Sequence, residues 1–236
     1  MSYGVAYASE CSLPSHLFTI SDRRIADHDQ LSNSVFSGAF REQPQAGAGM
    51  ALNFLRGFLR EPRLVASVVP SSRFLEQRLI EASNLPAAHR VVELGPGTGG
   101  TTRAFLSQLG KDAQLLSIEL NPFFHELLDA IEDPRLTNHL GNAEEIAKIL
   151  KLYDMEEPDV VISGIPFSKM PEAVSIRVVQ AIKDNLIEGG RFIAYQLRAD
   201  VAAIADPIMG APAGCSLELR NIPPMRVYSW LKSTDI

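Results

Sequence analysis

The second half of the chain alternates between short apolar runs and longer segments with helical periodicity. Five strands are predicted in this region, at 90–94, 114–120, 136–141, 159–165 and 191–197. Helices are predicted between and after them, at 101–109, 122–131, 143–150 and 171–186, with a short one near Asp200. Repeated strand–helix units indicate a parallel sheet with helices on both faces.

The end of the chain departs from this alternation. Two further strands, at 215–220 and 226–231, are separated only by residues 221–225. That gap is too short for a crossover helix, so the last two strands are expected to be antiparallel. The sequence therefore predicts an α/β fold, with a mostly parallel seven-stranded sheet that ends in an antiparallel β-hairpin.

The segment before the first strand is less regular. Residues 1–47 show little periodicity, and we expect a poorly structured extension there. Residues 49–60 form a helical pattern with a wide apolar face and a narrow polar stripe. A second helix is predicted to start after Ser71 or Ser72 as N-cap and to end near Ala82. These patterns divide the chain into an extension and a domain from 48 to 236, whose first helices lie within 49–82.

The sequence VVELGPGTGG, residues 91–100, predicts a strand that leads into a glycine turn. Glycines allow a tight turn and a close approach to a ligand, and the helix start behind them favours an anionic group. Gly95, Gly97 and Gly100 match the G-x-G-x-x-G of dinucleotide-binding proteins, whereas Glu93, Gly95, Gly97 and Gly99 match the E-x-G-x-G-x-G of methyltransferases. An acid at position 93 can accept hydrogen bonds from the ammonium group of S-adenosylmethionine and would repel a pyrophosphate. An ordinary glycine turn is the alternative.

Polar residues also end the second and third strands. Glu119 lies about twenty residues beyond the glycine turn, where an acid can bind both ribose hydroxyls of NAD or S-adenosylmethionine, and Leu120 follows it. Asn142, before Ala143, stands where methyltransferases often place an acid that accepts from the adenine amino group, and its carbonyl oxygen can also accept. The alternatives are an exposed acid at a strand end for Glu119 and a helix N-cap for Asn142.

The sequence SGIPF, residues 163–167, follows the fourth strand and would face the transferred methyl group. Amine methyltransferases commonly carry Asn or Asp here, followed by Pro, Ile or Leu, then Pro and an aromatic residue that packs on the substrate. Gly164 replaces the Asn or Asp, Ser163 precedes it, and Pro166 and Phe167 remain. A strand-ending turn with a core aromatic is the alternative. Four motifs at four strand ends favour a ligand site, because open α/β sheets bind ligands at this edge.

Together with FLRGFLREPRLVASVVPSSRFL and NIPPMRVY, these motifs resemble the bacterial phospholipid N-methyltransferases, which methylate phosphatidylethanolamine or ornithine lipids. That family is similar to the rRNA adenine dimethylases, and the resemblance covers about residues 50–232. VPSSR (69–73), SGIP and N-x-P-P (221–224) are more specific than the glycine motif. Phe167-Ser168 departs from the Leu-Leu that those enzymes often have, and Asn142 departs from Asp.

The resemblance implies a Rossmann-like class I methyltransferase fold and S-adenosyl-L-methionine as cofactor, with no metal. Ser163 and nearby carbonyls would orient a neutral amine, and Tyr195, at the end of the fifth strand, would line the same pocket unless it is an ordinary core residue. Ser72 and Arg73 would bind the cofactor carboxylate or a lipid phosphate, with Arg73 favouring the phosphate. Ser72 as a helix cap is the alternative. Thr101 is expected among the cofactor contacts.

Charge narrows the class of partner. The net charge of −6 disfavours nucleic acid as a partner, whereas residues 48–90 carry six Arg and three Glu and have a net charge of +3. With the helix at 49–60, this segment predicts contact with an anionic membrane surface. A lid packed on the domain and a solvated helix face are the alternatives. The N-terminus lacks the pattern of a signal peptide, so we expect a cytoplasmic protein, peripheral on the inner membrane face if its substrate is a lipid.

The sequence thus predicts an S-adenosylmethionine-dependent N-methyltransferase that acts on a phospholipid or aminolipid headgroup. An N-methyltransferase of a small soluble amine is the second interpretation, with the N-terminal segment as a lid. An rRNA adenine methylase is disfavoured by the acidic charge and by the lack of a basic C-terminal domain. A non-enzymatic cofactor-binding protein and an NAD dehydrogenase fit the motifs less well, and the oligomeric state stays open.

Overall fold

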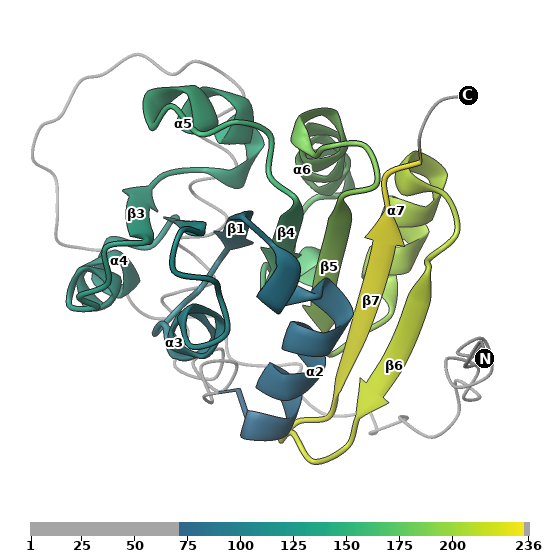
Figure 1. The fold of residues 1–236 in the computed structure, drawn as a ribbon. Helices are drawn as coiled ribbons and strands as arrows, with labels where there is room; N and C mark the ends of the chain where they lie inside the picture. The colour runs from purple at the N-terminus through teal and green to yellow at the C-terminus, as the bar shows by residue number, and fades with distance from the viewer. Residues whose placement is uncertain (1–70, 234–236) are drawn as a thin grey trace, which may run out of the picture.

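The computed structural model describes residues 71–233 of the chain. The predicted extension 1–47, the helix predicted at 49–60 and the first two residues of VPSSR lie outside this range. Within it, seven strands form one sheet in the order β3-β2-β1-β4-β5-β7-β6 (Figure 1). Their bounds are Arg90–Leu94 for β1, Gln114–Glu119 for β2, Leu136–Leu140 for β3, Val160–Ser163 for β4, Arg191–Gln196 for β5, Gly214–Glu218 for β6 and Met225–Leu231 for β7.

Helices connect or flank these strands. The α-helices are α2 (Arg73–Ser83), α3 (Gly100–Leu106), α4 (Pro122–Asp129), α5 (Ile146–Leu152), α6 (Glu172–Asn185) and α7 (Asp200–Met209). Short 3₁₀ turns are η3 (Leu85–Ala87), η4 (Ala143–Glu145) and η5 (Phe167–Lys169). Between residues 71 and 233, none of the helices has the length and apolar character needed to span a membrane.

The strand pairing confirms the predicted mixed sheet. β1 to β5 pair in parallel, and β7 runs antiparallel to both β5 and β6. Most of the predicted boundaries agree with the structure to within a few residues. β4 ends at Ser163 instead of Ile165, because the Ser163 hydroxyl accepts a hydrogen bond from the Ile165 amide (3.3 Å) and the chain turns there.

Two apolar clusters cover the two faces of the sheet. One cluster joins α2 and α3 to the sheet, and the other joins α5, α6 and α7 to its opposite face (Figure 1). The central strands are buried on both sides, which explains why they read as nearly continuous apolar runs in the sequence. Trp230 of β7 is fully buried and stacks on Phe192 and Tyr228, with ring centroids 5.2 and 5.6 Å away.

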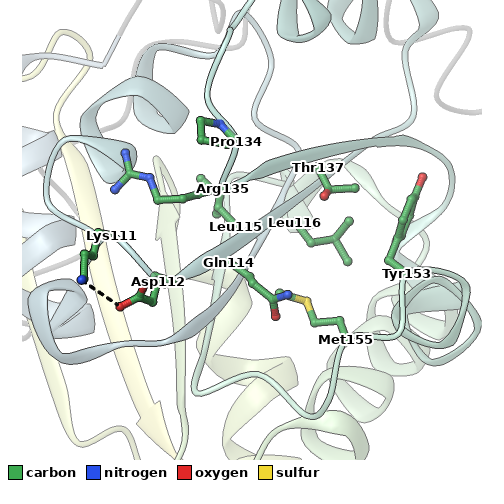
Figure 2. Close-up of a pocket in the computed structure, with 11 residues that line it drawn as sticks. Lys111, Asp112, Gln114, Leu115, Leu116, Pro134, Arg135, Thr137, Tyr153 and Met155 are labelled. Atoms are coloured by element: carbon green, nitrogen blue, oxygen red, sulfur yellow. Dashed lines mark ion pairs between the residues drawn. The ribbon is translucent and has the colours of Figure 1, made fainter.

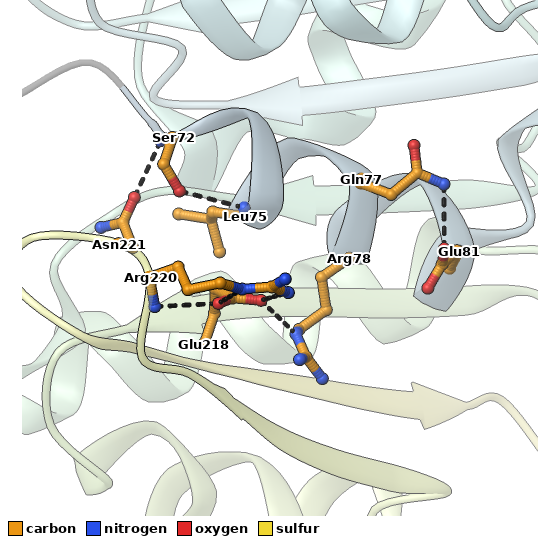
Figure 3. A network of polar contacts seen from close by, with 8 residues as sticks. All are labelled: Ser72, Leu75, Gln77, Arg78, Glu81, Glu218, Arg220 and Asn221. Atoms are coloured by element: carbon orange, nitrogen blue, oxygen red, sulfur yellow. Dashed lines mark hydrogen bonds and ion pairs between the residues drawn. The ribbon is translucent and has the colours of Figure 1, made fainter.

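The start of α2 is tied to the turn between β6 and β7 (Figure 3). Ser72 is the N-cap, as predicted, and its Oγ accepts a hydrogen bond from the Leu75 amide (3.3 Å). The Ser72 amide donates to Asn221 Oδ1 (2.8 Å), and Asn221 Nδ2 donates to the Pro223 carbonyl (2.8 Å). The motifs VPSSR and N-x-P-P, 149 positions apart along the chain at these residues, therefore contact each other directly.

A buried carboxylate strengthens the same connection. Glu218 at the end of β6 is 1% exposed and accepts hydrogen bonds from two arginines. Arg220 donates through Nε (2.9 Å) and Nη2 (3.0 Å), and Arg78 of α2 donates through Nε (3.1 Å). Arg220 first, and Arg78 with it, lower the pKa of Glu218 to about 2. The ionised carboxylate therefore joins the helix to the hairpin.

This pKa predicts a pH-dependent stability. The ordinary value of 4.5 falls to about 2 in the fold, so the stabilisation from Glu218 is complete above pH 4.5 and disappears as the pH falls through 4.5 towards 2. At about pH 7, we expect a larger free energy of unfolding for the parent protein than for Glu218→Gln. At about pH 3, this difference should be smaller. Urea unfolding at both pH values measures it. The exposed Glu132, as Glu132→Gln, is the control, and an undiminished difference at low pH would contradict the prediction.

Candidate functional site

The carboxyl ends of the parallel strands meet at one edge of the sheet. The glycine turn follows β1, Glu119 ends β2, the SGIPF turn follows β4, and Tyr195 and Gln196 end β5. β7 runs in the opposite direction and pairs its Arg226 with Gln196, so the turn between β6 and β7 lies at the same edge. The structure therefore brings the predicted motifs of β1, β2, β4 and β5 to one side of the sheet.

Glu93 lies below the glycine turn and is 1% exposed. Its Oε1 accepts a hydrogen bond from Thr101 (2.5 Å), and its Oε2 accepts from Thr102 (2.6 Å) and Ser117 (3.1 Å). Burial raises the pKa of Glu93, and the three hydroxyl donors oppose that rise. They also occupy most of its acceptor sites, so its contact with a cofactor ammonium group stays a prediction. The bonds seen in the structure hold β1, β2 and the start of α3 together.

Glu119 points across the glycine turn. Its Oε2 accepts from the Gly97 amide (3.0 Å) and its Oε1 from the Asn121 amide (2.8 Å), and burial raises its pKa. The Leu120 amide also donates to this carboxylate, which has about four acceptor positions, so some acceptor capacity stays available for the hydroxyls of a ribose. Gly97 has a φ of 59°, and a Cβ placed there would meet nothing within 4 Å. Open space thus lies beside Glu119 and the partly exposed Leu120.

Asn142 caps the helical turn after β3. Its Oδ1 accepts a hydrogen bond from the Glu144 amide (3.1 Å), and its Nδ2 donates to Glu144 Oε1 (3.2 Å). Ala143, next to it, is 8% exposed. The N-cap interpretation is confirmed, and the contact of Asn142 with an adenine stays a prediction.

The SGIPF turn is anchored from β5. Gln196 donates through Nε2 to the Ile165 carbonyl (2.8 Å). Ser163 is fully buried, Pro166 is partly exposed, and Phe167 is 1% exposed within the core beside α6 and α7. These positions favour the core-aromatic interpretation of Phe167. They also place Ser163 below the surface of the edge, so substrate contacts by both residues stay predictions.

Gly164 lies directly against the Tyr195 side chain. A Cβ added at Gly164 would be 2.3 Å from the Tyr195 hydroxyl oxygen, 2.8 Å from its Cζ and 3.0 Å from the Gly95 carbonyl oxygen. The Tyr195 hydroxyl thus occupies the space that an Asn or Asp side chain at position 164 would enter. The sequence motifs pointed to both residues, but they did not predict that the Tyr195 hydroxyl would fill the place of an Asn or Asp side chain at position 164. The available signal was a glycine in place of the expected Asn or Asp, combined with a tyrosine at the end of β5.

The surroundings of Tyr195 determine how its hydroxyl can act. Burial first, and then the nearby Glu93 carboxylate, raise the pKa of Tyr195, so the hydroxyl is neutral at physiological pH. The Thr101 side chain lies close enough to the Tyr195 hydroxyl to influence its pKa. The single Thr101 hydroxyl proton is donated to Glu93, so Thr101 does not take up a lone pair of the Tyr195 oxygen. The lone pairs on the Tyr195 oxygen then remain available to accept a hydrogen bond from an amine.

Arg73 lies on the surface beside this edge. Its guanidinium carbon is 4.8 Å from the centre of the Phe74 ring, and that of Arg220 is 4.0 Å from the same ring. Ser72 makes the helix-cap bond that was expected as its alternative role. The predicted binding of a cofactor carboxylate or lipid phosphate by Ser72 and Arg73 stays a prediction.

A hollow of about 240 Å³ lies at the opposite edge of the sheet (Figure 2). Residues before and at the start of β2 and β3 line it, including Lys111, Gln114 and Arg135, together with Tyr153 and Met155. The amino ends of the strands therefore surround it, away from every predicted motif, and it is not the site expected for this fold. From residue 71 to residue 233, no group of three or more His, Cys, Asp or Glu side chains is arranged to hold a metal ion.

Comparison with known proteins agrees with this geometry. No family model matches the chain. An ornithine lipid N-methyltransferase of Singulisphaera acidiphila is 28% identical over 141 residues, which are 59% of this chain and 73% of the relative. The chain is an S-adenosylmethionine-dependent methyltransferase. The predicted class of enzyme and its cofactor are thereby confirmed, as is the resemblance to the lipid N-methyltransferases.

Two further proteins are similar to this chain over only part of its length or in fold alone. A ribosomal RNA small subunit methyltransferase A of a Synechococcus species is 31% identical over 97 residues, 39% of this chain and 33% of that protein. The N-methyltransferase NodS of Bradyrhizobium japonicum, solved with S-adenosyl-L-homocysteine, superposes with a TM-score of 0.58 over 78% of this chain and 98% of its own. At 10% identity, that superposition shows the methyltransferase fold alone.

The close approach of Gly164 to Tyr195 predicts a specific steric conflict. Gly164→Ala should lower the free energy of unfolding by about 1–3 kcal/mol, because the new methyl group would overlap the Tyr195 hydroxyl. Adding Tyr195→Phe should recover part of this loss, which a double-mutant cycle of urea unfolding measures. Gly110→Ala is the control, because a Cβ at Gly110 meets nothing within 4 Å. Independent effects of the two substitutions would contradict the contact.

Proposed function

We propose that the protein transfers the methyl group of S-adenosylmethionine to the amine of an aminolipid headgroup. One observation carries the proposal. The Tyr195 hydroxyl, neutral and able to accept a hydrogen bond, fills the space that the missing polar side chain of the SGIPF motif would enter, and would take over its role. Similarity to an ornithine lipid N-methyltransferase supports an aminolipid as the acceptor.

The proposed cofactor site extends across the ends of β1, β2 and β3. Glu119 would bind the ribose hydroxyls with the acceptor capacity that the backbone amides leave, and Gly97 leaves open space for them. Glu93 would keep the glycine turn in place through Thr101 and Thr102. When bound, S-adenosylmethionine supplies a methyl group already activated by the positive sulfonium.

The amine would be held at the end of β5. Tyr195 would accept a hydrogen bond from the neutral amine, which leaves the nitrogen lone pair free to face the methyl group. A phenol of raised pKa keeps its proton, so Tyr195 orients the amine and does not act as a base. Gln196 fixes the Ile165 carbonyl and thereby holds the SGIPF turn beside that position.

The proposed lipid acceptor is also consistent with the charge at this edge. Arg73 is exposed next to Ser72 at the start of α2, and a guanidinium can bind a phosphate through two parallel hydrogen bonds. A phospholipid would offer its phosphate to Arg73 and its amine to Tyr195. This arrangement would place the protein at the inner face of the membrane.

The cofactor assignment predicts a loss of affinity in Glu119 variants. Glu119→Ala should weaken binding of S-adenosylmethionine by about 10- to 100-fold, because a charged acceptor of two hydroxyls is removed. Glu119→Gln should lose less, because one oxygen acceptor remains. Isothermal titration calorimetry measures both, with Glu132→Ala as the control on the opposite edge. Unchanged affinity in both Glu119 variants would show that the site is wrongly placed.

The acceptor class predicts where a labelled methyl group goes. With radiolabelled S-adenosylmethionine, we expect the protein to label the lipid fraction of a bacterial extract and to leave the soluble metabolite fraction unlabelled. Tyr195→Phe should lower kcat about 10- to 100-fold and change cofactor affinity little, because the hydroxyl would contact the amine and not the cofactor. Label confined to the soluble fraction would replace the aminolipid with a small soluble amine.

A further inference from the structure

The turn between β6 and β7 exposes two large apolar side chains. Leu219 is 68% exposed and Ile222 is 79% exposed. Leu197, which follows β5 at the same edge, is 53% exposed. Exposed apolar side chains that gather in one place can mark a contact surface, and these lie at the edge that holds Glu119 and Tyr195. The rim of the candidate site is therefore apolar at its β5–β7 end.

Arginines surround these apolar side chains. The segments 71–78 and 218–226 carry four Arg (73, 78, 220 and 226) and two Glu (76 and 218), a net charge of +2 within a chain of net charge −6. Glu218 is buried beneath Arg78 and Arg220, so its charge does not reach the surface. Glu76 is only partly exposed. The outward-facing charge of this rim is positive.

The turn is held in place from beneath. Asn221 bonds Ser72, and the Arg220 guanidinium binds Glu218 through two nitrogens (Figure 3). Asn221 is 6% exposed and also donates to the Pro223 carbonyl, and the Arg220 guanidinium stacks on Phe74. Their polar groups are thus satisfied within the fold. Leu219 and Ile222, in contrast, extend from a fixed base. A rigid turn with two apolar side chains on either side of a guanidinium loses little conformational entropy on binding.

We propose that this turn, Leu219–Pro224, docks on a phospholipid bilayer. Leu219 and Ile222 insert below the headgroups, and Arg220 and Arg73 lie at the level of the lipid phosphates. The contact brings the rim of the site onto the membrane, where an aminolipid headgroup can reach Tyr195. The inference rests on the proposed aminolipid acceptor and adds the surface by which the protein reaches it.

A bilayer suits this surface better than a protein does. A stable protein interface buries about 800 Å² on each partner, whereas two side chains on a turn supply far less than that. Membrane contact needs only a few inserted apolar groups together with cationic groups near the anionic surface. Both features are present, and they are adjacent.

The experiment is co-sedimentation of the full chain with vesicles of equal parts phosphatidylcholine and phosphatidylglycerol. Neither lipid carries a primary amine and no S-adenosylmethionine is added, so binding is read independently of methyl transfer. We expect the double variant Leu219→Asn, Ile222→Asn to lower the partition coefficient about tenfold. Arg73→Gln should lower it about fivefold at low salt and have little effect at high salt.

Matched controls lie at the opposite edge of the sheet. Leu152, the last residue of α5, is 64% exposed, and the Lys111 side chain is 91% exposed before β2. Leu152→Asn and Lys111→Gln should bind vesicles within twofold of the parent protein. Thermal unfolding of each variant serves as the check on folding, and the exposed substitutions should leave the midpoint unchanged.

Several results would overturn the docking surface. One is a failure of the parent protein to bind vesicles, and another is equally strong binding by the double variant. A lowered thermal midpoint of the double variant would show that the turn packs against this chain instead. A parent dimer that the double variant dissociates would instead identify an interface between copies. If the docking result holds while labelled methyl never enters lipid, the proposed function fails and the membrane contact stands.

Discussion

A buried negative charge organises the site of this protein. Glu93 is almost completely enclosed and must be satisfied inside the fold, because an unpaired buried carboxylate is strongly unfavourable. Three hydroxyls meet that need, and one of them, on Thr101, lies near Tyr195. Tyr195 in turn fills the space over Gly164. The glycine turn, the end of β5 and the turn after β4 therefore meet around one carboxylate.

A second carboxylate organises the rim. Glu218 joins α2 to the β6–β7 hairpin through Arg78 and Arg220, and Asn221 joins the same elements through Ser72. These buried polar groups would be destabilising if they were left unpaired. Their hydrogen bonds hold the turn between β6 and β7, with its exposed apolar side chains, beside the candidate site. The rim and the proposed reaction centre meet at β5 and β7, whose paired ends lie side by side.

Much of the fold could be predicted from the sequence, because strand–helix alternation and the short gap before the last strand leave few topologies. The helix cap at Ser72 and the cap at Asn142 were also predictable, because local hydrogen bonds decide them. Element boundaries such as the end of β4 were harder to predict, because a single hydrogen bond to the Ser163 hydroxyl ends that strand. The family motifs fall at one edge of the sheet, as their places at the strand ends predicted.

The sequence by itself determined the order of elements, the class of enzyme and the strand ends that carry its polar residues, because periodicity and motif spacing are local properties. Only the tertiary structure decided how those residues act. It placed Phe167 in the core, surrounded Glu93 with hydroxyls, and set Tyr195 against Gly164. Burial, and contacts such as that of Tyr195 with Gly164 about thirty positions away, depend on packing in three dimensions, which no spacing along the chain records.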